Sequence, residues 1–91
     1  MPDFFVSSIN NASAFRVAYG WKCGGKTGVF IRPAGFNAPK PGNSGYGQIV
    51  SRLDSLILGK KVQVGEVRGF LRDTLICDIY YKGKNILEYM Q

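Results

Sequence analysis

The sequence predicts a small, mainly β domain of five short strands, with one long helix between the third strand and the fourth. Several segments alternate apolar and polar residues with a period of two, which is typical of half-buried strands. One segment, residues 46–58, instead repeats its apolar residues with the period of an amphipathic helix. The chain has 91 residues, so residues 1–91 are expected to form a single domain with a small core.

Three strands are expected before the helix. Phe4–Ile9 is the first, and the turn at 10–13 follows it because its asparagines tolerate turn geometry. Ala14–Tyr19 alternates apolar and polar residues and is the second strand. Trp21–Lys26 contains adjacent glycines and is expected to be a loop, after which Val29–Ile31 has the β-branched and aromatic character of a buried strand.

The helix is the clearest element in the sequence. A loop rich in proline and glycine precedes it, and Gly59 is expected to end it in a left-handed conformation. One helical face between these limits carries the apolar residues Ile49, Val50, Leu53, Leu56 and Ile57.

Two further strands are expected after the helix. Lys61–Val67 is the fourth, with a possible bulge at Gly65, and Arg68–Asp73 is expected to be a polar loop. Thr74–Tyr81 is the fifth strand, and Ile86–Met90 would close one end of the core as a short helix or an extended tail.

This order of elements is that of an OB-fold, a five-stranded barrel. Composition alone would suit an SH3-like barrel equally well, but the position of the helix favours the OB-fold. OB barrels often bind single-stranded nucleic acid through aromatic platforms and basic side chains. Candidate residues for such binding are Arg16, Tyr19, Trp21, Arg32, Tyr80 and Tyr81. Each aromatic could instead pack in the core, although the glycine-rich setting of Trp21 favours exposure.

The charge of the chain suits a polyanionic partner. Twelve Lys and Arg oppose six Asp and Glu, giving a net charge of +6. Between Phe4 and Leu53 there is no carboxylate, so the first half of the chain cannot supply carboxylate ligands for Mg²⁺ or Ca²⁺. The same half contains the cations Arg16, Lys22, Lys26, Arg32, Lys40 and Arg52. A basic surface that serves only solubility is the alternative.

Other residue types exclude several classes of site. The chain has no histidine, and Cys23 and Cys77 are too few for a cysteine-based zinc site, so no metal and no cofactor are expected. The sequence leaves open whether the two cysteines pair, but two buried, reduced thiols are the expectation. No signal peptide and no apolar run of ~20 residues is present, so we expect an intracellular, cytoplasmic protein that makes no membrane contact.

Four segments, taken in order, carry a family resemblance: Asn11–Val17, Phe30–Lys40, Leu56–Val62 and Ile79–Glu88. Together they resemble the staphylococcal nuclease (thermonuclease) family, whose members are Ca²⁺-dependent nucleases with an OB-fold. In that family the first segment holds an Asp-Gly-Asp-Thr turn, and the second holds an Arg-bearing strand and an Asp-Thr/Ala-Pro-Glu motif. The resemblance implies the staphylococcal nuclease-like type of OB barrel over nearly the whole chain.

The same resemblance implies that the catalytic acids are missing. Ser13 stands where the family has the second metal-binding Asp of its turn, and Asn37 stands where it has the next one. Lys40 occupies the position of the general-base Glu. A protonated lysine cannot act as that base, and hydrolysis also needs the cation, so such a pocket could hold a phosphate without cutting it.

Arginine is the part of the catalytic set that persists. Arg32 matches the first catalytic arginine of the family, whereas the second would fall near Thr74, with Arg72 two residues away. We therefore predict an inactive nuclease homologue that binds nucleic acid through a basic groove. The residues expected to make this contact are Arg16, Trp21, Lys22, Arg32, Lys40 and Tyr80.

Two alternatives remain open at this point. A protein-interaction or assembly module, possibly homo-oligomeric, would use Tyr46, Phe70 and Tyr89 as surface anchors. A residual phosphodiesterase would cleave oligonucleotides in a cation-dependent reaction that requires Arg32. The choice between RNA and DNA, and between single strand and duplex, is also open.

Overall fold

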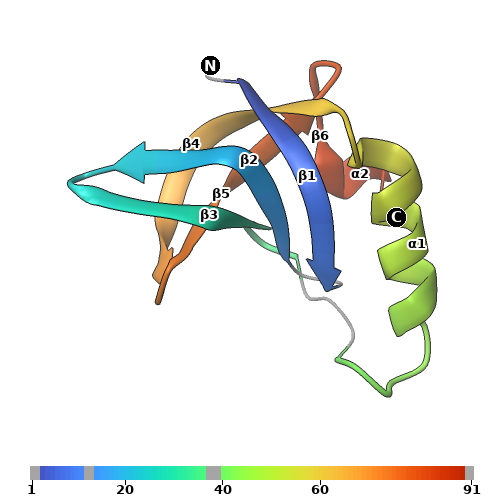
Figure 1. The fold of residues 1–91 in the computed structure, drawn as a ribbon. Helices are drawn as coiled ribbons and strands as arrows, with labels where there is room; N and C mark the ends of the chain where they lie inside the picture. Colours follow the sequence, from blue (N-terminus) through green and yellow to red (C-terminus); the bar gives the residue numbers. More distant parts are fainter. Residues whose placement is uncertain (1–2, 12–13, 37–39, 90–91) are drawn as a thin grey trace.

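Six strands and two helices make up the part of the chain that the structure describes (Figure 1). The structure is a computed structural model, and it describes residues 3–11, 14–36 and 40–89. Ser13, Asn37 and Met90, on which parts of the sequence analysis depend, lie outside the described residues. The elements are β1 (Asp3–Asn11), β2 (Ala14–Cys23), β3 (Lys26–Pro33), α1 (Tyr46–Ile57), β4 (Lys61–Leu71), β5 (Thr74–Tyr81), β6 (Lys84–Asn85) and α2 (Ile86–Tyr89).

Five of the strands close into a mixed barrel. The strand order is β3-β2-β1-β4-β5-β6, and a parallel pairing of β3 with β5 joins the two sides. This seam runs from the pair Phe30 and Thr74 to the pair Pro33 and Cys77. α1 lies between β3 and β4 in the chain and packs against β1 (Figure 1). The predicted mainly β class, with the main helix between the third and fourth strands, is confirmed, and the barrel is consistent with an OB-fold-like architecture.

The core fills the barrel with side chains that alternate along the strands. On β5, every second residue from Leu75 to Tyr81 is buried and the residues between them are half-buried on the outer face. Phe15 and Ile31 are fully buried, and Leu53 and Ile57 of α1 close the barrel from the helix side. Each such large side chain contributes about 1.5–3 kcal/mol to folding.

The end of α1 is hydrogen-bonded to β1. Gly59 has φ 75, which confirms the predicted left-handed stop. Its N–H donates to the carbonyl of Val6, and the N–H of Val6 donates to the carbonyl of Lys60, both at 2.9 Å. Of the two alternatives for the C-terminal segment, the short helix is the one formed. Neither helix in the described ranges has the length and apolar character needed to cross a bilayer.

The predicted loop at Trp21–Lys26 is wrong. β2 continues to Cys23 and β3 begins at Lys26, with the glycine pair between them (φ 57 and 80) as the hairpin turn. Figure 1 shows this hairpin projecting from the barrel. A register shift between Arg16 and Trp21 includes Gly20 (φ 74), and this bulge interrupts the alternation that would have marked a longer strand.

The predicted polar loop at Arg68–Asp73 is also wrong. β4 extends to Leu71, and only Arg72 and Asp73 form the turn to β5. The residues of β4 beyond Gly65 are exposed or half-buried, so their polar character reflects an outer strand surface and not a loop.

Both cysteines are free thiols. Cys77 is fully buried in the barrel, whereas Cys23 is half-buried at the end of β2. Burial, and secondarily the charge of Asp78, raises the pKa of Cys77 to about 12.

Candidate nucleic-acid interface

An open pocket lies between β3, the adjacent ends of β1 and β2, and the β4–β5 turn. Its volume is about 430 Å³. Its walls come from all five barrel strands and from the β4–β5 turn, and the lining residues are Asn10, Ala14, Phe30, Leu71, Arg72, Asp73 and Thr74. The parallel pair Phe30 and Thr74 crosses this pocket, so the pocket spans the seam that closes the barrel.

Arg16 and Arg32 lie next to the pocket-lining residue Phe30, on adjacent strands. Arg16 is exposed and lies directly opposite Phe30 in the β2–β3 register. Arg32 is two residues further along β3, between the buried Ile31 and Pro33, so it shares the outer face with Phe30. Diagonal neighbours of this kind are about 7–8 Å apart, within the joint reach of two arginine side chains. The structure therefore brings together two of the predicted residues.

Arg72 adds a third arginine at the same place. It lies in the β4–β5 turn and lines the pocket. Its φ of 57 is in the left-handed region, which costs a non-glycine residue about 1–2 kcal/mol. Residues held in such conformations are concentrated at functional sites. The sequence does not predict this conformation, because the polar residues of 68–73 indicate a longer loop; it indicates only that Arg72 lies near the position of the second catalytic arginine of the resembled family.

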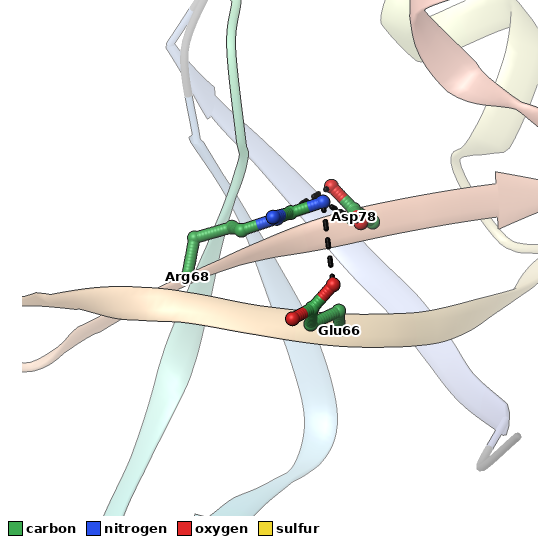
Figure 2. A network of polar contacts seen from close by, with 3 residues as sticks. All are labelled: Glu66, Arg68 and Asp78. Carbon is green, nitrogen blue, oxygen red and sulfur yellow. Dashed lines mark hydrogen bonds and ion pairs between the residues drawn. The ribbon is translucent and has the colours of Figure 1, made fainter.

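The carboxylates near these arginines are Asp73, which lines the pocket, and Asp78 and Glu66, which contact Arg68. Asp78, on the outer face of β5, accepts hydrogen bonds from Nη2 of Arg68 at 2.9 Å and from Nε at 3.4 Å, and Glu66 lies 3.4 Å from the same Nη2 (Figure 2). The hydrogen bonding of Arg68 to the Asp78 carboxylate, followed by the charges of Asp78 and Glu66, raises the pKa of Arg68. In the described ranges, no three or more His, Cys, Asp or Glu side chains gather to form a metal site.

The prediction that Trp21 is an exposed platform is wrong. Trp21 is 4% exposed and belongs to the core. Its indole N–H donates to the carbonyl of Phe30 at 2.7 Å, and its ring lies 5.7 Å from that of Phe70. Nζ of Lys26 lies 4.8 Å from the Phe70 ring centroid. Because its ring is covered, Trp21 supports the wall of the pocket and cannot stack on a base.

Tyr19 and Lys22 lie on the hairpin beside Trp21. Tyr19, named from the sequence as a candidate, is 99% exposed. Lys22 is also exposed, and both side chains border a shallow depression of about 380 Å³ over the hairpin. An exposed ring beside a cation is the arrangement that single-stranded nucleic acid uses.

The remaining two predicted residues lie elsewhere. Tyr80 is half-buried on the outer face of β5, six residues from Thr74 and thus roughly 20 Å from the pocket. Lys40 is exposed in the loop before α1, where its carbonyl accepts a hydrogen bond from the N–H of Asn43 at 3.0 Å. The residues predicted to form one groove are therefore spread over the surface. Arg16 and Arg32 lie near the pocket, Lys22 lies on the hairpin, and Lys40 and Tyr80 lie elsewhere.

Comparison of the chain with models of known protein families gives no match, and comparison with curated proteins gives none of significance. The case for a function therefore depends on the residues and geometry described above.

Proposed function

We propose that this chain is a catalytically inactive, nuclease-like OB-fold domain that binds nucleic acid through the outer face of β2 and β3. The observation that carries the proposal is the diagonal pair Arg16 and Arg32 beside a pocket whose wall is Phe30 and whose rim holds Arg72. The staphylococcal nuclease-like type rests on the sequence resemblance and on the shared order of strands and helix.

The three arginines suit phosphate groups. A guanidinium presents a planar fork of donors that pairs with two phosphate oxygens at once. Phe30 in the pocket and Tyr19 on the hairpin offer aromatic surfaces on which bases can stack. Phosphate contacts and stacking together favour a single strand over a duplex, whose bases are already stacked.

The same site lacks the means to hydrolyse a phosphodiester. Lys40 replaces the general base implied by the resemblance, and Asp78 is engaged by Arg68. Asp73 is a single carboxylate, whereas a hard cation needs several converging oxygen ligands. The domain is therefore proposed to hold nucleic acid without cleaving it.

Titration of labelled single-stranded and duplex oligonucleotides, followed by fluorescence anisotropy, tests this function. Three phosphate contacts on a single strand give a slope of about −2 in log K against log salt, which is a roughly 20-fold loss of affinity from 50 to 200 mM salt. Arg16→Gln should weaken binding, whereas the control Arg52→Gln removes the same charge from α1 and should leave binding nearly unchanged. If no oligonucleotide binds at low salt, or if the affinity does not change with salt concentration, the proposal is wrong. Cation-dependent cleavage that disappears in Arg32→Ala would replace it with a nuclease.

One observation favours the alternative of a protein-interaction module. β4 pairs with β1 only over Lys61–Gln63, so the rest of this β4 edge has no strand beside it among the described residues. Val67 and Leu71 on that stretch are 36% and 53% exposed. An added strand could pair there. Light scattering coupled to size exclusion decides between the two: a stable dimer that no longer binds oligonucleotide would favour assembly.

A further inference from the structure

A second group of basic side chains surrounds the β5–β6 turn, at the opposite end of β5 from the pocket. Figure 1 shows β5 running between these two ends of the barrel. The group, here named the lysine–tyrosine cluster, consists of Lys60, Lys61, Lys82, Lys84, Tyr80, Tyr81 and Tyr89. Sequence analysis did not predict it, because the lysines come from two distant segments that the β4–β5 pairing brings together.

Three of the lysines are held over tyrosine rings. Nζ of Lys82 lies 5.4 Å and Nζ of Lys60 lies 6.0 Å from the ring centroid of Tyr81. Nζ of Lys84 lies 5.2 Å from the ring of Tyr89. Cation–π contacts of this kind orient the ammonium groups and leave their remaining hydrogen-bond donors available.

The tyrosines beneath them are themselves fixed. Tyr81 is 8% exposed and meets Tyr89 edge to face at 6.0 Å. The hydroxyl of Tyr89 donates to the carbonyl of Tyr81 at 3.0 Å. The cluster is therefore a preorganised set of charges on a rigid base, which lowers the entropic cost of binding an anion.

The surface within the cluster is concave and carries charged side chains. A pocket of about 230 Å³ is lined by Lys61, Gln63, Tyr80 and Lys82, with Asp3 as the one carboxylate among its lining residues. Glu88, the other nearby acid, is exposed on α2. Four cations against these two acids leave the region positive.

The cluster is separate from the arginine site, the name used here for Arg16, Arg32, Arg72 and the pocket beside them. Asp78, Arg68 and Glu66 lie between the two on the outer face of β4 and β5, and this network carries one positive and two negative charges (Figure 2). Thr74 and Tyr80, at the two ends, are roughly 20 Å apart along β5. A single strand is more extended per nucleotide than the 3.4 Å of a duplex strand, so fewer than about six nucleotides would cover that distance.

We propose that the lysine–tyrosine cluster is a second contact site for the phosphodiester backbone of nucleic acid, an inference that rests on the proposed function of the arginine site. Two features favour nucleic acid over an anionic bilayer. The site is concave, and its lining offers an amide and a phenol as donors to phosphate and base edges. A strand long enough to reach both sites then binds more tightly than a short one, because the second contact becomes intramolecular.

NMR titration of the ¹⁵N-labelled protein with a 16-nucleotide single strand tests the inference. Amide shifts at Lys61, Lys82 and Gly83 report on the lysine–tyrosine cluster, and shifts at Arg72 and Thr74 report on the arginine site. Shifts in both groups are expected. Shifts confined to the arginine site would overturn the inference alone, shifts confined to the cluster would overturn the proposed function alone, and no shifts would overturn both.

A variant and a length series provide a second measurement. Lys82→Gln/Lys84→Gln should reduce the salt slope for the 16-mer by about 1.4, since each phosphate contact on a single strand contributes about 0.7. A dinucleotide should bind this variant and the unmodified protein alike, because it is too short to reach from the arginine site to the cluster. An unchanged slope for the 16-mer would refute the second contact. Cluster shifts caused by vesicles of phosphatidylserine and not by the 16-mer would assign the cluster to membranes instead.

Discussion

The indole N–H of Trp21 donates a hydrogen bond to the carbonyl oxygen of Phe30 across the β2–β3 hairpin, at 2.7 Å. Phe30 lines the pocket on the outer face of β3 and pairs with Thr74 at the start of the barrel seam. A buried side chain thus supports the backbone from which the proposed binding surface is built.

Replacing Trp21 by phenylalanine should lower the free energy of unfolding by about 1–3 kcal/mol, because the carbonyl of Phe30 loses its donor in a partly buried place. Urea denaturation measures this change. Tyr19→Ala, at a fully exposed ring on the same strand, is the control and should stay within about 0.5 kcal/mol of the unmodified protein. Equal stability of the phenylalanine variant would mean that the hydrogen bond contributes nothing.

Arg72→Gly should separate stability from binding. Glycine adopts the observed φ of 57 without strain, so the free energy of unfolding should rise by up to about 1 kcal/mol. Oligonucleotide affinity should fall because one phosphate contact is removed. Thermal melting and anisotropy measure the two effects. The control Arg72→Lys keeps both the charge and the strained backbone, so it should retain the original stability and most of the affinity. If Arg72→Gly binds the oligonucleotide as tightly as the unmodified protein, Arg72 is not part of the interface.

The buried thiol of Cys77 should make the fold less stable in alkali. Its pKa is about 12 in the folded protein and close to 9.0 when the chain unfolds. Above pH 9 the unfolded chain therefore loses a proton that the folded chain keeps, so stability present below pH 9 is lost progressively as the pH rises towards 12. Urea denaturation at pH 8, 9 and 10 measures the decline, and Cys77→Val is the control that removes this thiol. The free energy of unfolding of the unmodified protein should fall relative to that of Cys77→Val as the pH rises from 8 to 10. If the two free energies keep a constant offset, the thiol does not titrate as described.

Periodicity identified the elements whose two faces differ most. β5 alternates strictly between buried and half-buried residues, and α1 has one apolar face, so both were recognisable from the sequence. The hairpin of β2 and β3 was not, because the bulge at Gly20 shifts the alternation and glycine pairs resemble a loop. Because the glycine pair predicts a loop at Trp21–Lys26, it also predicts an exposed Trp21, whereas this side chain is buried in the core.

The candidate site was predicted less completely than the fold. Arg16 and Arg32 could be paired from the sequence because neighbouring strands of a hairpin carry them. The left-handed backbone of Arg72 depends on where β4 ends. Tyr80 lies at the opposite end of β5 from the pocket beside Arg16 and Arg32, a separation that local sequence patterns do not contain. Lys60 and Lys82 meet around Tyr81 only through the β4–β5 register, which local patterns do not contain.

The parallel seam between β3 and β5 also has a consequence for how the protein assembles. It joins segments far apart in the chain, and pairings of that kind slow folding because a long loop must be closed to form them. The pocket exists only when this junction is closed, because residues of both strands line it. A phosphate chain seated across it would hold the two strands together, so that occupancy itself would slow the reopening of the barrel.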